Sequence, residues 1–109
     1  MIVFISGKIT GDPTYRSKFA DAETVIANLG HTVLNPTIIP DGVEYETCMR
    51  ICFALIDAAD MVVFLPDYRS SDGAIRERVY AGQCGKKIRQ YENFVRKEIA
   101  KENREWYGF

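Results

Sequence analysis

The sequence of 109 residues predicts an α/β fold in which helices cover both faces of a parallel sheet of four to five strands. Two observations carry this prediction. Short runs rich in β-branched and aromatic residues alternate along the chain with longer segments whose apolar residues recur every three or four positions. Glycine, proline and asparagine stand between these segments, as is typical of the connections in βαβ units. Such units join parallel strands through right-handed crossovers.

The N-terminal half of the chain contains two predicted strands and two predicted helices. Residues 1–5 form a continuous apolar run, which predicts a buried parallel strand. Apolar residues at helical spacing predict a helix over about residues 14–29, and Gly30 ends it. A short strand is expected at residues 31–34, and a second helix at about residues 45–58.

The C-terminal half repeats the alternation. Residues 61–65 predict a buried strand, and a helix is expected at about residues 73–84. A weaker strand at residues 86–89 is expected at an edge of the sheet, followed by a charged helix over residues 91–104. The aromatic tail, residues 106–109, either packs on this domain or docks on a second subunit. We therefore predict one domain over the whole chain and a homo-oligomer, a dimer or larger.

Composition argues against several classes of function. Lys and Arg (14) nearly balance Asp and Glu (15), so we expect neither nucleic acid nor a membrane as a partner. His31 is the only histidine, the three cysteines form no CxxC pair, and there is no GxSxG motif. A zinc site and a Ser-His-Asp hydrolase are therefore not expected, and we predict no cofactor. The cysteines and the absence of a signal-peptide pattern predict a cytoplasmic protein.

Two loops rich in glycine and hydroxyl side chains are expected at the same edge of the sheet. The first loop, residues 6–11, follows the first strand, and the second loop, residues 66–73, follows the third. Ligands of open α/β sheets bind at the carboxyl ends of the strands, where backbone N–H groups can approach them. The first loop is neither a Walker A motif nor a GxGxxG motif. A turn without a ligand is an equally good interpretation of that loop alone.

Glu77 is the candidate catalytic group. Gly73, Glu77 and Ala81 are spaced four apart and share one helical face, so the carboxylate is flanked by small residues. A capping box is excluded because Ala74 stands three positions before Glu77 and cannot cap. A surface glutamate favoured by the helix dipole is the alternative.

Three blocks of the sequence resemble the nucleoside 2-deoxyribosyltransferase-like superfamily, and most closely its DUF4406 branch. Together they cover roughly residues 2–88. The resemblance implies a Rossmann-like (flavodoxin-like) sandwich and cleavage of the N-glycosidic bond of a nucleoside or nucleoside 5′-monophosphate. The blocks are residues 5–11 with Tyr15 and Phe19, residues 30–36, and residues 60–66 with 71–77, Ala81 and 85–86.

The resemblance also implies roles for individual residues. Glu77 would attack the anomeric carbon, and water or a second base would resolve the glycosyl-enzyme. Ser71 would bind a 5′-phosphate, and Lys8 would either pair with that phosphate or remain a solvated cation. Tyr15 is expected either to hydrogen-bond near Glu77 or to pack, and Tyr68 to stack on a base or sugar. The other residues expected to bind substrate are Ser6, Gly7, Ile9, Gly11, Gly73 and Ala74.

One position departs from the pattern of active relatives. They usually carry an Asp eight residues before the Asp that opens the third strand, and counting back from Asp60 gives Cys52. A thiol is a poor substitute in proton transfer. Cys52 could simply be a small core residue. Two main hypotheses therefore stay open: an enzyme that acts through Glu77, and a non-catalytic nucleotide-binding module that has lost the catalytic Asp. A structural or interaction role is the third.

Overall fold

Four parallel strands form a single sheet in the computed structural model, with the order β2-β1-β3-β4. The structure describes residues 1–107, and side chains as far as Asn103. Ser6 pairs with Phe64, so β1 and β3 end side by side at the centre of the sheet. The strands are β1 (Ile2–Ser6), β2 (Thr32–Leu34), β3 (Met61–Phe64) and β4 (Lys87–Gln90).

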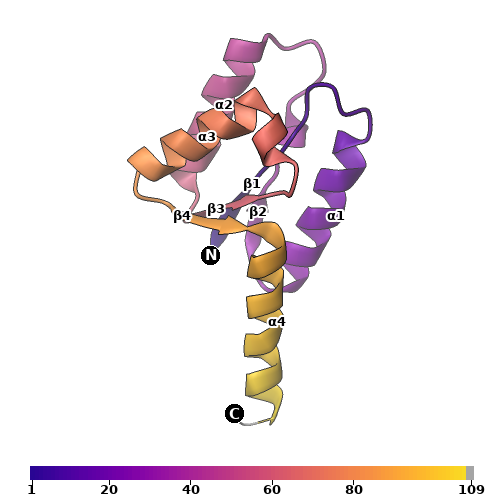
Figure 1. Ribbon diagram of the computed structural model, residues 1–109, viewed down its shortest axis with the longest axis vertical. Coiled ribbons are helices and arrows are strands. Elements are labelled where there is room, and N and C mark those ends of the chain that lie inside the picture. Colours follow the sequence, from indigo (N-terminus) through magenta and orange to yellow (C-terminus); the bar gives the residue numbers. More distant parts are fainter. Residues whose placement is uncertain (108–109) are drawn as a thin grey trace.

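Helices cover both faces of this sheet (Figure 1). On one face, side chains of α1 and α4 pack against Val3, Ile5 and Val63. On the other face, side chains of α2 and α3 pack against Phe4 and Val62. Successive residues of β1 thus enter opposite cores, and this burial on both faces explains the uninterrupted apolar runs. The helices are α1 (Tyr15–Asn28), α2 (Tyr45–Ala58), α3 (Asp72–Gln83) and α4 (Tyr91–Tyr107), with short 3₁₀ helices η1 (Pro36–Ile38) and η2 (Tyr68–Ser70).

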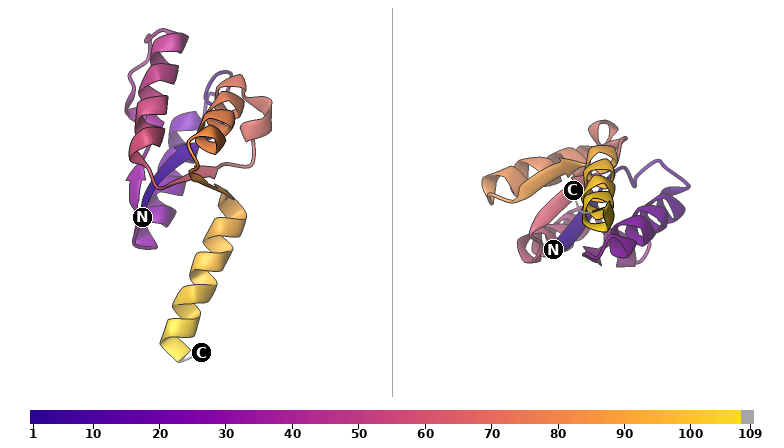
Figure 2. Two further views of the ribbon diagram at one scale, coloured as in Figure 1. Left: turned by 90° about the vertical axis from the view of Figure 1, so that its left-hand side faces the viewer. Right: turned by 90° about the horizontal axis from the view of Figure 1, so that it is seen from below.

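Helix α4 extends away from the rest of the domain (Figures 1 and 2). Phe94 anchors the N-terminal part of this helix. Its side chain is buried, and its ring packs near the ring of His31. Ile99, further along, is 45% exposed. The side chains of the aromatic tail lie outside the described residues. No helix within the described part of the chain is long and apolar enough to cross a membrane.

The predicted α/β sandwich is confirmed, with four strands among the described residues and β4 at an edge of the sheet. The helix after β3 begins at Asp72 because the Ser71 side chain caps it, accepting a hydrogen bond from the Ala74 backbone N–H. The charged helix α4 continues to Tyr107, past the predicted end at residue 104.

Candidate active site

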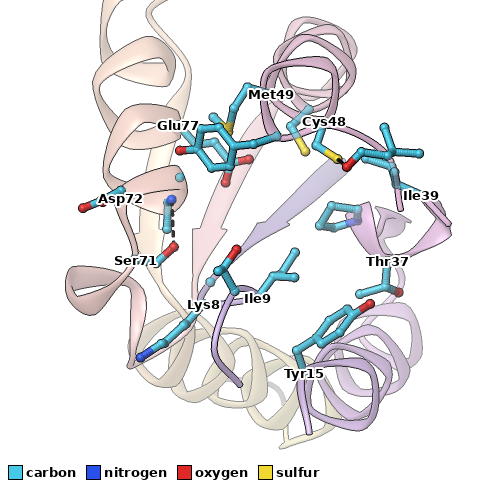
Figure 3. A pocket seen from close by; sticks show the side chains of 18 of the residues that line it. Lys8, Ile9, Tyr15, Thr37, Ile39, Cys48, Met49, Ser71, Asp72 and Glu77 are labelled. Carbon is cyan, nitrogen blue, oxygen red and sulfur yellow. Dashed lines mark hydrogen bonds between the residues drawn. The ribbon is translucent and has the colours of Figure 1, made fainter. Parts of the chain in front are cut away.

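A cavity of about 630 Å³ opens at the carboxyl ends of the central strands (Figure 3). The first loop forms one wall, and the start of α3 forms the wall beside it. The remaining walls come from α1, from the segment between η1 and α2, and from α2 itself. Strand order reverses between β1 and β3, and this switch point is where ligands of open α/β sheets bind.

Glu77 stands at the inner wall of this cavity. It lies on α3, is only 6% exposed and accepts a hydrogen bond of 2.6 Å from the Ser6 hydroxyl. Ser6 is the last residue of β1 and is fully buried. The sheet therefore holds the carboxylate beside the first loop, rather than leaving it on the surface of the helix.

Burial dominates the electrostatics of Glu77. It raises the pKa of Glu77 to about 7, although hydrogen bonds from Ser6 and from the Cys52 thiol act in the opposite direction. Burial also raises the pKa of the Cys52 thiol well above its usual range, and the neighbouring Glu77 charge adds to the rise. The thiol therefore stays protonated near neutral pH and acts toward Glu77 as a hydrogen-bond donor.

Helix α2 supplies a wall rich in sulfur. Cys48, Met49 and Cys52 all line the cavity, and Cys48 and Met49 are seen above it in Figure 3. Cys52 is 5% exposed and also belongs to the core under the sheet. Cys52, at which the sequence departs from the expected pattern, thus belongs to the core and also lines the cavity with Glu77.

The start of α3 brings small residues and a hydroxyl to the cavity. Ser71, Gly73 and Ala74 line it. Capping uses Ser71 Oγ as an acceptor at 3.2 Å from the Ala74 nitrogen, which leaves the hydroxyl proton free to be donated. A Cβ atom on Gly73 would meet the nearest atom, Met49 Sδ, at an ordinary 3.5 Å. Ala81 belongs to the core instead, so its small size serves packing.

The first loop is held against the segment that follows β3. A Cβ atom on Gly7 would lie 2.9 Å from Leu65 Cδ1, so only glycine permits this approach. The Lys8 backbone N–H donates to Asp67 at 3.1 Å. Gly7, Lys8 and Ile9 line the cavity. The two predicted loops therefore meet, as the parallel topology requires.

Lys18, on α1, ties this arrangement together. Its ammonium group donates to the Lys8 carbonyl at 2.8 Å and to the carboxylates of Asp12 and Asp67. Burial lowers the pKa of Lys18, but these carboxylates outweigh burial and raise it overall. The hydrogen bond with Lys18 is in turn the main cause that lowers the pKa of Asp12 to about 2. Lys18 is a positioning residue for the first loop.

Tyr15 lies across the cavity from Glu77 (Figure 3). Its hydroxyl donates to Asp41 at 2.9 Å, and Arg16 pairs with the same carboxylate at 3.0 Å. Arg16 also donates to the Thr37 carbonyl at 2.8 Å. Of the two roles expected for Tyr15, the structure shows packing: its ring lies against the core on the α1 side, and its hydroxyl joins α1 to the loop before α2.

Most of the predicted site residues come together, and three do not line the cavity. Ser6 lies behind Glu77 as its hydrogen-bond donor. Gly11, with φ of 82°, forms the turn of the first loop. Tyr68 packs its ring against Phe64, with centroids 5.0 Å apart, and lines a different hollow. Tyr68 is therefore not placed to stack on a ligand of the main cavity.

Sequence reasoning missed two residues that shape the site, Lys18 and Asp41. Lys18 lies four positions after the predicted start of its helix, and this position is equally compatible with a lysine exposed to solvent. Asp41 stands in a loop whose path no periodicity predicts.

The fold and this cavity define a Rossmann-like α/β domain with a buried carboxylate at the carboxyl edge of its sheet. The family model of the domain of unknown function DUF4406 matches residues 1–90, and the chain belongs to this family. The expected membership of the DUF4406 branch is thereby confirmed. No match was found among curated proteins.

Two solved structures share the fold. The 2-deoxyribosyltransferase from Bacillus psychrosaccharolyticus is 18% identical, with a TM-score of 0.66 over 83% of this chain and 71% of that chain. The 2-deoxyribosyltransferase from Leishmania mexicana is 17% identical, with a TM-score of 0.65 over 82% of this chain. This chain spans 62% of the length of the Leishmania protein.

Proposed function

We propose that the protein binds a nucleoside or nucleoside 5′-monophosphate in the main cavity and cleaves or transfers its N-glycosidic bond through Glu77. The observation that carries the proposal is the carboxylate of Glu77, buried at the inner wall of the cavity and oriented by Ser6. Two 2-deoxyribosyltransferases share the fold, which supports the same general class of reaction.

In the proposed reaction, a carboxylate oxygen of Glu77 attacks the anomeric carbon of the sugar. The bond from that carbon to the base nitrogen breaks, and the base leaves with the bonding electron pair and takes up a proton from solvent. A glycosyl ester of Glu77 results. Water or a second base then attacks the same carbon, gives its proton to solvent, and releases the free carboxylate.

The electrostatics of Glu77 suit such a nucleophile. A pKa of about 7 leaves roughly half of the molecules ionised at neutral pH. A carboxylate held away from water is more reactive toward the positive charge that develops on the sugar, because the cavity screens that charge less than bulk water does. The Ser6 hydrogen bond keeps Oε1 of Glu77 oriented.

The surrounding groups could bind the rest of the substrate. The Ser71 hydroxyl and the N–H groups at the start of α3 can donate to a phosphate or sugar oxygen. Lys8 also lines the cavity and offers a charge to a phosphate. Ile9 and Met49 provide apolar surface for a base.

The alternative is a nucleotide-binding module without turnover. The observation that favours it is Cys52, whose thiol lines the same cavity as Glu77 at the position where active relatives usually have a carboxylate. A protonated thiol with a strongly raised pKa cannot deliver a proton to a departing base at neutral pH.

Base release distinguishes the two. The protein is incubated with a panel of ribo- and deoxyribonucleosides and their 5′-monophosphates, and free base is separated by chromatography. Base release that Glu77→Gln abolishes supports the enzyme. Thermal stabilisation by a nucleotide without base release supports the binding module. The absence of both contradicts the assignment of this cavity to nucleosides and nucleotides.

We further propose that residues 1–109 act as one domain in a homo-oligomer. Helix α4 extends beyond the sheet and exposes apolar side chains such as Ile99. Light scattering should give a mass of two or more chains, and deletion of residues 105–109 should lower it. A monomer that deletion leaves unchanged would contradict the proposal.

A further inference from the structure

A second hollow lies on the other side of η2 from the main cavity, at the carboxyl ends of β3 and β4. It encloses about 310 Å³. Phe64 and Gln90, which end these strands and pair with each other, both line it. The same edge of the sheet therefore carries two separate depressions. Ser70 of η2 borders the main cavity, whereas Tyr68 and Arg69 border this hollow.

Three arginines from different elements surround the hollow. Arg69 comes from η2, Arg78 from α3 and Arg89 from β4, and among the residues that the structure describes no acidic one lines the hollow. Within the described part of the chain, the arginines that form ion pairs are Arg16 and Arg76, and none of the three is among them. The whole chain carries a net charge of −1, so this concentration of positive charge is local.

Local contacts orient two of these guanidinium groups without neutralising them. Arg69 Nε donates to the Tyr68 hydroxyl at 3.1 Å, and its guanidinium lies 5.4 Å from the centre of the Tyr68 ring. Arg89 donates to the Ile88 carbonyl at 2.8 Å. Each keeps further N–H donors available, because a guanidinium has five. Like charges around one hollow repel, and a bound anion would relieve that repulsion.

We propose that this arginine hollow is a binding site for a compact, multiply charged phosphate group, such as that of a nucleoside diphosphate or of inorganic pyrophosphate. Planar guanidinium groups match the oxygens of a phosphate bidentately. The small volume and the balanced charge of the remaining chain favour one compact group over the backbone of a nucleic acid, which needs an extended basic surface. This site does not depend on the function proposed for Glu77.

The test is a calorimetric titration of the full chain with inorganic pyrophosphate and with ADP. The test variant combines Arg78→Gln and Arg89→Gln, and Arg69→Gln alone is a second, independent variant. All three side chains are exposed, so the core is left intact. The matched control combines Arg50→Gln and Arg96→Gln, which remove the same charge from exposed positions outside the hollow. Lys8→Gln tests binding in the main cavity.

For pyrophosphate, one saturable site is expected in the wild type and the control. ADP should also occupy the main cavity proposed above, and Lys8→Gln should weaken only that site. The double variant in the hollow should bind pyrophosphate at least tenfold more weakly, and Arg69→Gln alone at least threefold more weakly. In the arginine hollow, ADP and pyrophosphate should displace each other. This pattern would support the proposal.

Four outcomes would overturn it. The first three concern pyrophosphate: no saturable binding, an equal loss of binding in the control, and a loss of binding only in Lys8→Gln. The fourth is binding of a single-stranded oligothymidylate that is tighter than binding of pyrophosphate and grows with the length of the oligonucleotide. The third places the anion in the main cavity, and the fourth identifies a nucleic-acid surface. None of these readouts depends on base release, so failure here is distinct from failure of the proposed function.

Discussion

The Ser6 hydroxyl donates a hydrogen bond of 2.6 Å to Oε1 of Glu77 across 71 positions of sequence. The contact joins the end of β1 to the second turn of α3, and both residues are buried. It opposes the effect of burial, which alone would raise the pKa of Glu77 further. One hydroxyl therefore both orients the proposed nucleophile and keeps it ionisable near neutral pH.

Ser6→Ala should shift the pH dependence of base release to higher pH. Removal of the hydrogen bond favours the protonated form of Glu77, so its pKa rises above about 7. Activity requires the carboxylate, so the rate at pH 6 should fall by about tenfold while the rate at pH 9 falls less. Ser17→Ala, at an exposed position of α1, is the control. An unshifted profile in Ser6→Ala would refute this role of Ser6.

Glu77→Gln should stabilise the protein at high pH. The carboxyl binds its proton more tightly when folded, with a pKa of about 7 against 4.5 when unfolded, so the wild type loses stability as pH rises between these values. Below pH 4.5 this pH-dependent difference in the free energy of unfolding between the variant and the wild type should vanish. Above pH 7 the variant should be more stable by about 3 kcal/mol.

Denaturant unfolding at pH 4, 6 and 8 measures this difference. Glu102→Gln, on the exposed part of α4, is the matched control and should differ from the wild type by less than about 0.5 kcal/mol at each pH. A stability difference for Glu77→Gln that does not grow between pH 4 and pH 8 would mean that Glu77 is not held in a desolvating environment.

Cys52→Asp should accelerate base release. The new carboxyl would lie beside Glu77, and the two would share a proton near neutral pH, which provides the acid that the thiol cannot. We expect a rise of at least tenfold, at a stability cost of about 2 kcal/mol for a second buried acid. Cys52→Asn has nearly the same shape but does not titrate. Equal rates in both variants would show that proton transfer at this position is not limiting.

Gly7→Ala and Gly73→Ala should have opposite effects on stability. The methyl group at position 7 would clash with Leu65, which is only 2% exposed, and should cost about 1–3 kcal/mol. At position 73 the space is adequate, and alanine in the first turn of α3 should gain up to about 1 kcal/mol. Thermal denaturation measures both. Because Gly73 lines the cavity, its variant should still raise the KM for the substrate.

The sheet and helices could be predicted because their sequence patterns are local. Burial on both faces requires uninterrupted apolar runs such as residues 61–65, and the amphipathic helices show their spacing directly. Helix α3 begins where its capping serine stands. The position of Glu77 followed from the topology, since the carboxyl ends of β1 and β3 must meet.

The contacts between distant loops could not be predicted in this way. Tyr68 was expected in the main cavity, but η2 turns its ring toward Phe64 and the opposite hollow. Lys18 joins two carboxylates, Asp12 and Asp67, from separate loops. No periodic spacing in the sequence predicts either ion pair. Cys52 could be located by counting, but only the structure shows that it lines the same cavity as Glu77.

The most direct measurement is a rapid-quench experiment on the protein and a nucleoside or nucleotide that it turns over, followed by peptide mass spectrometry. The account predicts a peptide containing residue 77 that gains the mass of one bound sugar residue, with the ester on Glu77 and none in Glu77→Gln. Turnover that leaves no sugar on Glu77, or that survives in Glu77→Gln, would contradict it.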